Sequence, residues 1–115
     1  MIERKEIVAN NFLIRYLHSS SNNSNATLLF VHGWRSSKEV WSKIIENLQN
    51  DYEIYAIDLP GFGSSQIPDR PLDINDFSNT VKNFIEKLEL TNTIAIGHSH
   101  GGATLINLVS QNLDI

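Results

Sequence analysis

The residues of this chain that could do chemistry are concentrated in the segment Gly97-His98-Ser99-His100-Gly101-Gly102, directly after the apolar run 93–96. Glycines two positions before and two positions after a serine let neighbouring backbone pack against a sharply turned chain. Such a turn between a strand and a helix lifts the serine hydroxyl clear of the sheet, as in a nucleophile elbow. Ser99 is therefore a candidate nucleophile, and Gly97 and Gly101 are candidate residues for shaping its turn.

Two further loops could join Ser99 in one site. The apolar run 27–31 ends at His32-Gly33-Trp34, and the strand predicted at 53–57 ends at Asp58 in a loop rich in glycine and proline. In open sheets of parallel strands, ligands bind outside the carboxyl ends of the strands. We therefore expect the three loops to line one crevice.

Attack of a serine on a carbonyl forms an oxyanion that needs hydrogen-bond donors. Ser99 precedes a predicted helix, whose first N–H groups are free and whose dipole favours negative charge. The N–H of His100 is the natural first donor. The N–H of Trp34, from the turn after the first parallel strand, is placed to be the second.

The order of the predicted elements supplies the sheet that these loops require. Two β-favouring runs, 2–8 and 12–17, flank a turn at 9–11 whose asparagines tolerate left-handed backbone, which predicts an antiparallel hairpin. The polar stretch 19–25 is typical of a surface loop. Three later apolar runs alternate with helical patterns, which indicates parallel strands joined by right-handed crossovers. The predicted class is α/β, in one domain over residues 1–115 with helices on both faces of the sheet.

Three helices follow from the spacing of apolar residues, and each apolar stripe is interpreted as core packing. The first helix has a capping box at Ser36-Ser37-Lys38-Glu39, and the second begins at Asp73. The three stripes are Val40, Trp41, Ile44, Ile45 and Leu48; Ile74, Phe77, Val81, Phe84, Ile85 and Leu88; and Gly102, Leu105, Ile106, Val109 and Leu113.

Composition narrows the classes of function. The chain has 41% hydrophobic and 19% charged residues, as in ordinary globular proteins, and a net charge of −4 without a basic cluster. Nucleic acid and anionic membrane surfaces are therefore not expected as partners. The absence of cysteine excludes disulfides and thiolate chemistry. The charged amino terminus and the lack of a long apolar run predict a soluble, cytoplasmic location.

The three motifs together resemble the amino-terminal half of an α/β-hydrolase. The resemblance rests on His32-Gly33-Trp34, on Asp58-Leu59-Pro60-Gly61-Phe62-Gly63-Ser64-Ser65 and on the Ser99 turn, in that order, and it covers nearly the whole chain. It implies Ser99 as nucleophile and the N–H groups of His100 and Trp34 as the oxyanion hole. It also implies that His32 and Gly33 shape the loop of the second donor.

Two residues within the motifs refine what the resemblance implies. Serine at position 99, where haloalkane dehalogenases and epoxide hydrolases carry aspartate, disfavours those branches and leaves ester, amide, thioester or carbon–carbon bonds in a small acyl substrate. His100 stands where related proteins commonly carry a bulky apolar residue. It therefore places a titratable group beside the nucleophile.

Other interpretations of the same residues are weaker. His98 and His100 flank Ser99, but the order of the triad places the base far downstream, and two histidines alone make a poor metal site, so neither a metal nor another cofactor is expected. The Gly61-Phe62-Gly63 segment lacks the third glycine and the lysine of phosphate-binding loops and is interpreted as a turn. Asp58 is expected to anchor its loop by hydrogen bonds.

The catalytic acid and histidine implied by the resemblance are not found in this chain. His18 lies on the predicted hairpin and Asp114 on the end of the third helix, so neither is a substitute. We therefore expect an inactive fragment, truncated after the helix that follows Ser99, whose strand 93–96 is an exposed apolar edge open to self-association or to the missing carboxyl half. The alternative is a non-catalytic module that binds a partner through that edge.

Overall fold

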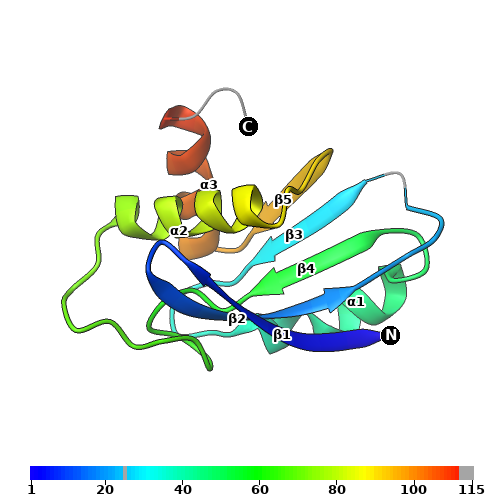
Figure 1. Ribbon diagram of the computed structural model, residues 1–115, viewed down its shortest axis with the longest axis horizontal. Coiled ribbons are helices and arrows are strands. Elements are labelled where there is room, and N and C mark those ends of the chain that lie inside the picture. Colours follow the sequence, from blue (N-terminus) through cyan, green and yellow to red (C-terminus); the bar gives the residue numbers. More distant parts are fainter. Residues whose placement is uncertain (25, 112–115) are drawn as a thin grey trace.

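The computed structural model describes residues 1–24 and 26–111, which form a five-stranded sheet with helices on both faces (Figure 1). The spatial order of the strands is β1-β2-β4-β3-β5. The strands are β1 (Ile2–Ala9), β2 (Phe12–Ser19), β3 (Thr27–Val31), β4 (Glu53–Ile57) and β5 (Thr93–Gly97). The helices are a short 3-10 helix η1 (Lys38–Trp41) and the α-helices α1 (Ser42–Leu48), α2 (Ile74–Lys87) and α3 (His100–Gln111). The predicted α/β class is confirmed.

The amino-terminal hairpin forms as predicted. β1 and β2 pair antiparallel along their whole length, and the two residues between them have positive φ angles, 51° at Asn10 and 66° at Asn11. Asparagine tolerates this backbone because its short polar side chain can hydrogen-bond locally. Asn10 also ties the hairpin to α2, because its N–H donates to the side-chain oxygen of Asn83 at 2.8 Å.

The three parallel strands place the three predicted loops side by side. β3 lies between β4 and β5, and the register pairs Val31 with both Ile57 and Gly97. The chain therefore leaves the sheet at neighbouring points before His32, Asp58 and His98. The three motif-bearing loops therefore follow the carboxyl ends of adjacent strands, as predicted.

Two apolar clusters hold the helices on the sheet, one on each face. On one face, α2 and α3 bury Phe77, Val81, Phe84 and Leu108 against side chains of β2, β3 and β4. On the other face, α1 and η1 pack Ile45 and Trp41 against Phe30 and Ala56, with the rings of Phe30 and Trp41 4.8 Å apart. Helices on both faces are what a parallel sheet with apolar strands requires.

The first helix differs from its prediction. No side-chain capping bond forms at Ser37, and the α-helix begins only at Ser42, after the 3-10 turn of η1. The prediction of a capping box is wrong, because the backbone N–H of Lys38 donates to the Asp58 carboxylate at 2.7 Å. The stripe is also narrower than predicted, since Val40 and Ile44 are exposed while Ile45 is buried.

The third helix buries a different face from the predicted one. Leu105 is buried as expected, but Thr104 and Leu108 join it, while Ile106 and Val109 are 74% and 52% exposed. The predicted Leu113 lies outside the described residues. The spacing placed Ile106 and Val109 on the core face and left out Leu108, whereas the face that α2 and the sheet cover in this chain includes Leu108.

β5 is the edge strand of the sheet within the described part of the chain. It pairs with β3 on one side only, and Ile94 on it is 52% exposed. Ile94, Ile106 and Val109 together expose apolar surface along this edge, and the expected apolar strand edge is present. Unpaired strand backbone beside apolar side chains favours association with another polypeptide segment.

The start of α2 carries an ion pair whose effect depends on pH. Asp73 caps the helix, and Asp76 completes the capping box while both its carboxylate oxygens accept hydrogen bonds from Arg70 at 3.0 Å. The bonds from Arg70 lower the pKa of Asp76 to about 2. Because the folded-state pKa lies below that of the unfolded chain, the ionised Asp76 stabilises the fold above about pH 4, and this contribution is lost as the pH falls toward 2.

We expect Asp76→Ala to lower the free energy of unfolding by about 0.5–1 kcal/mol at pH 7, the scale of a helix cap. The difference from wild type should shrink as the pH falls from 4 toward 2. Thermal unfolding at several pH values measures it. Glu86→Ala, at an exposed acid late in the same helix, should show neither the loss nor its pH dependence. A constant difference for Asp76→Ala across that range would contradict the assignment.

Candidate functional site

Ser99 lies in a strained turn between β5 and α3. Its φ angle is 55°, a left-handed value that is uncommon for a residue other than glycine. The turn is fixed on both sides, because the N–H of His98 donates to the carbonyl of Val31 at 3.1 Å and the N–H of Gly101 donates to the carbonyl of His98 at 3.0 Å. The strand-turn-helix geometry predicted around Ser99 is therefore present.

The glycines of the turn are required by close backbone contacts. A Cβ atom at Gly97 would lie 2.6 Å from the carbonyl carbon of Gly101, and one at Gly101 would lie 2.5 Å from the carbonyl oxygen of His32. The latter would approach the carbonyl of Val31 more closely still. Contacts below 3.0 Å are essentially never made by a real Cβ, so both positions are restricted to glycine by their neighbours.

The loop after β3 contacts the Ser99 turn through Gly33. A Cβ atom at Gly33 would lie 3.3 Å from the Cβ of Ser99 and 3.1 Å from the carbonyl oxygen of His98. The ring of Trp34, the next residue, lies edge-on to the ring of His100, with the two centroids 5.5 Å apart. The structure therefore brings the two predicted donor residues, Trp34 and His100, together beside Ser99.

His100 packs inside a group of aromatic rings. Its imidazole contacts Phe77 edge-on at 4.7 Å, and Phe62 lies 5.0 Å from the ring of Trp34. The Nε2 atom of His100 is buried and has no hydrogen-bond partner among the described residues. Burial lowers the pKa of His100, so the neutral imidazole is favoured beside Ser99.

His32 joins two of the three loops. It is fully buried, its Nε2 accepts a hydrogen bond from the N–H of Leu59 at 3.0 Å, and its Nδ1 lies 2.7 Å from the carbonyl of Gly33. The backbone N–H of Leu59 can only donate, so Nε2 of His32 must be the acceptor. Nδ1 therefore carries the proton and donates to the carbonyl oxygen of Gly33. Burial lowers the pKa of His32, which favours this neutral form.

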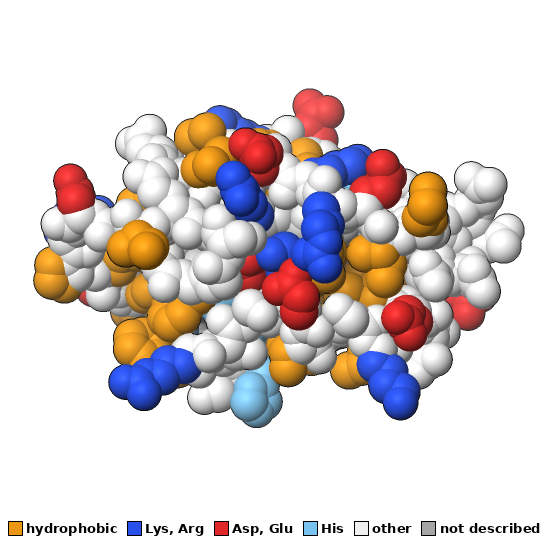
Figure 2. All heavy atoms as spheres, turned by 90° about the horizontal axis from the view of Figure 1, so that it is seen from below, with side chains coloured by type: hydrophobic (Ala, Val, Ile, Leu, Met, Phe, Trp, Pro, Cys, Tyr) orange, Lys and Arg blue, Asp and Glu red, His pale blue; other side chains and the backbone are white. Residues whose placement is uncertain are grey.

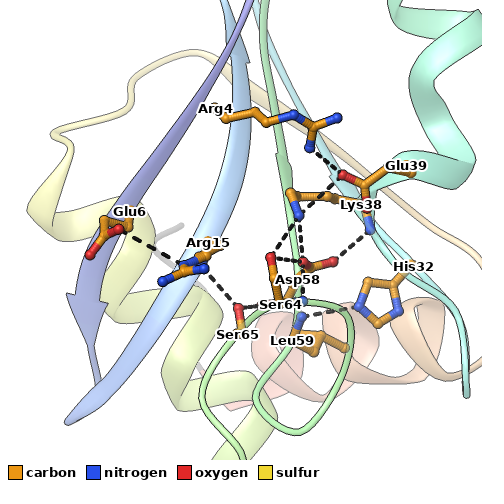
Figure 3. Close-up of polar contacts among 10 residues, drawn as sticks. All are labelled: Arg4, Glu6, Arg15, His32, Lys38, Glu39, Asp58, Leu59, Ser64 and Ser65. Atoms are coloured by element: carbon orange, nitrogen blue, oxygen red, sulfur yellow. Dashed lines mark hydrogen bonds and ion pairs between the residues drawn. The ribbon is translucent and has the colours of Figure 1, made fainter.

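A buried ion pair fixes the loop that follows β4 (Figure 3). The Asp58 carboxylate is fully buried and accepts hydrogen bonds from the Lys38 side chain at 2.6 Å, the Lys38 backbone N–H at 2.7 Å and the Ser64 backbone N–H at 2.9 Å. The expectation that Asp58 anchors its loop is confirmed. Sequence reasoning missed Lys38, because it treated that residue as part of a capping box.

The ion pair continues to the surface in a chain of alternating charges. The Lys38 Nζ atom lies 3.2 Å from a carboxylate oxygen of Glu39, which also accepts a hydrogen bond from Arg4 at 2.6 Å. Figure 2 shows the surface from below Figure 1, with basic and acidic side chains intermingled near its centre. Charges of both signs compensate each other at this end of the sheet.

The histidine–carboxylate pair formed by His18 lies away from Ser99. His18 on β2 contacts Glu53 at 2.5 Å and stacks on Tyr55, whose ring centroid lies 4.4 Å away. Glu53 is the first residue of β4, whereas Ser99 lies two residues beyond the last residue of β5, so the pair belongs to the opposite end of the sheet. Asp114 lies outside the described residues.

The described residues contain no group of three metal-ligating side chains that could hold an ion. The part of the chain that the structure describes also has no helix with the length and hydrophobicity needed to cross a bilayer.

Comparison with known proteins decides the family. The family model for the alpha/beta hydrolase fold matches residues 26–114. The chain belongs to the α/β-hydrolase fold family. As an α/β-hydrolase, it shares 30% identity over 105 residues with the biotin biosynthesis bifunctional protein BioHC of Saccharophagus degradans, covering 90% of this chain and 17% of that protein. It shares 29% identity with a haloalkane dehalogenase of Agrobacterium fabrum, covering 85% of this chain and 32% of the other.

Solved structures agree with this placement. A bacterial membrane phospholipase A matches with a TM-score of 0.90 and 28% identity, covering 98% of this chain and 36% of that structure. The epoxide hydrolase CorEH matches with a TM-score of 0.90 and 25% identity, covering 100% of this chain and 40% of that structure. The chain spans less than half the length of each of these proteins, which agrees with the predicted truncated form of the fold.

Proposed function

We propose that Ser99 is the nucleophile of a serine hydrolase that cleaves an ester, amide, thioester or carbon–carbon bond through an acyl-enzyme. The observation that carries this proposal is the left-handed φ of 55° at Ser99, which is held in a turn at the carboxyl end of β5. Strained backbone at such a position is typical of functional sites. A hydroxyl at this position can add to a carbonyl once a base removes its proton.

The oxyanion hole of this site consists of the N–H groups of His100 and Trp34. His100 is the first residue of α3, where backbone N–H groups have no partner within the helix and the helix dipole favours negative charge. Trp34 lies across from it, with the two rings 5.5 Å apart. His32 and Gly33 position the Trp34 loop through the hydrogen bonds of His32 and the contact of Gly33 with the Ser99 turn.

The described residues do not supply the base and the acid that this reaction needs. The Ser99 hydroxyl makes no hydrogen bond to any residue that the structure describes, and the recorded histidine–carboxylate pair, His18–Glu53, lies at the other end of the sheet. Loss of a triad base lowers turnover by about a millionfold in a well-studied serine protease. The 115-residue chain alone is therefore expected to be inactive.

Several of the related proteins are named as hydrolases, but the reactions that their names state differ. They include a pimeloyl-[acyl-carrier protein] methyl ester esterase of Pseudoalteromonas atlantica, 31% identical over 78% of this chain and 32% of that protein, alongside the dehalogenase. Ser99 supports an esterase-type reaction, because a serine hydroxyl suits acyl transfer.

The second candidate is a non-catalytic module that binds another polypeptide at the β5 edge. The observation in its favour is the exposure of Ile94, Ile106 and Val109 beside the unpaired side of β5. Addition of a strand to such an edge is a common mode of recognition. This candidate gives no reason for the strained Ser99 or for the glycine contacts around it.

A fluorophosphonate probe, which reacts with activated serines, distinguishes the two candidates. We expect no labelling of the 115-residue chain above the level of its Ser99→Ala variant, because the hydroxyl lacks a base. A longer product that supplies a downstream histidine and carboxylate should be labelled at Ser99, and its Ser99→Ala variant should not. Absence of labelling in a folded longer product would overturn the serine-hydrolase proposal, and labelling of the short chain would overturn its predicted inactivity.

A further inference from the structure

A cavity next to the Ser99 turn combines an apolar floor with one arginine that has no acidic partner. Its volume is about 420 Å³, within the range of small-molecule sites. The apolar side chains that line it include Trp34, Phe62, Leu72 and Phe77. Trp34 and Phe77 also contact the ring of His100, so two walls of the cavity are shared with the proposed oxyanion-hole residues.

Two arginines line this cavity, and only one is neutralised. Arg70 donates to both carboxylate oxygens of Asp76 at 3.0 Å, so its charge is already matched. Arg35 is exposed and makes no hydrogen bond or ion pair with any residue that the structure describes. The cavity therefore carries one positive charge that is available to a ligand.

The backbone at Arg35 is unfavourable for its residue type. The N–H of Ser36 donates to the carbonyl of Gly33 at 3.2 Å, which closes a turn with Arg35 at its third position, and the φ angle of Arg35 is 60°. Glycine or asparagine is the favoured residue at such a position. A strained arginine in a turn beside an active-site candidate is an observation from which a functional role can be inferred.

We propose that this cavity binds the apolar part of the substrate. Arg35 then binds a carboxylate or phosphate group at the end of the substrate that is remote from the reacting carbonyl. The inference rests on the proposed function, because it treats the ligand as the acyl substrate of Ser99. The planar guanidinium forms paired hydrogen bonds with either oxyanion. Trp34 supplies its backbone N–H to the reacting carbonyl and its exposed ring to the apolar part of the substrate.

The test measures binding to the 115-residue chain, so it needs no catalysis. Hexanoate, hexyl phosphate and the neutral hexanamide are titrated at low salt, and the amide and indole signals of Trp34 are followed by NMR. We expect the anions to bind about fivefold more tightly than hexanamide, the scale of an exposed ion pair, with the difference shrinking in salt. The stronger of the two anions identifies the group that Arg35 prefers.

Variants of the chain distinguish the contribution of the Arg35 charge to binding from that of the apolar side chains of the cavity. Arg35→Gln should abolish the preference for anions, while Lys43→Gln, which removes an exposed charge on the opposite face of the sheet, should leave it unchanged. Trp34→Ala should weaken binding of all three ligands. Equal binding of anions and hexanamide, or an anion preference that survives Arg35→Gln, would overturn the proposal. Because fluorophosphonate labelling reports Ser99 and these titrations report Arg35, failure of one proposal is distinguishable from failure of the other.

Discussion

Gly101→Ala should lower the free energy of unfolding by about 3 kcal/mol or more, above most single substitutions. The added methyl group would lie 2.5 Å from the carbonyl oxygen of His32 and closer still to that of Val31. Both acceptors belong to the backbone at the end of β3, so they cannot move aside like a flexible side chain. The Ser99 turn or the start of α3 must therefore shift. Urea unfolding followed by circular dichroism measures the change.

The neighbouring glycine is the matched control. A Cβ atom at Gly102 would meet the carbonyl oxygen of Gly97 at 3.6 Å, an ordinary van der Waals distance. Since alanine favours the helix more than glycine does, Gly102→Ala should change stability by less than about 1 kcal/mol, in the stabilising direction. Equal stability of Gly101→Ala and wild type would show that α3 does not pack against β3 in this way.

Lys38→Met should lower the free energy of unfolding by about 3–5 kcal/mol, the cost of breaking a buried ion pair by removing one partner. The substitution leaves the fully buried Asp58 carboxylate with bonds to the backbone of Lys38 and to Ser64 but without a cation. Thermal and urea unfolding report the loss. The loop after β4 should also become more susceptible to proteolysis, because Lys38 connects it to η1.

Two comparisons isolate the ion pair. Glu39→Gln alters only the exposed part of the same chain of charges and should cost less than about 1 kcal/mol. The double variant Lys38→Met with Asp58→Asn should recover part of the stability lost in Lys38→Met, because no buried charge is then left unpaired. A Lys38→Met variant as stable as Glu39→Gln would contradict the buried pair.

The parts of the fold that were predictable from sequence are those set by local chemistry. The hairpin follows from Asn10 and Asn11, which accept left-handed backbone, and α2 begins at Asp73 because its carboxylate caps the helix. The Ser99 turn was predictable for the same reason, since the two flanking glycines permit a contact that other residues would block. In each case the determining residues are close together in the chain.

The features missed by sequence analysis depend on residues far apart in the chain. Lys38 pairs with Asp58, twenty positions away, and no local pattern distinguishes a buried lysine from an exposed one. Periodicity marked Ile106 and Val109 as core, but a helix buries only the face that another element covers. The tautomer of His32 likewise follows from Leu59 on another loop.

The most direct test of the account is to label cells of the source organism with a fluorophosphonate, isolate the native product and determine its intact mass and labelled residue. We expect a product of roughly twice the present length, by the size of typical single domains, carrying the label on Ser99. Its downstream sequence should contain an in-frame histidine and carboxylate. A native product of 13.0 kDa without label would contradict a serine hydrolase and favour a module that binds through the β5 edge.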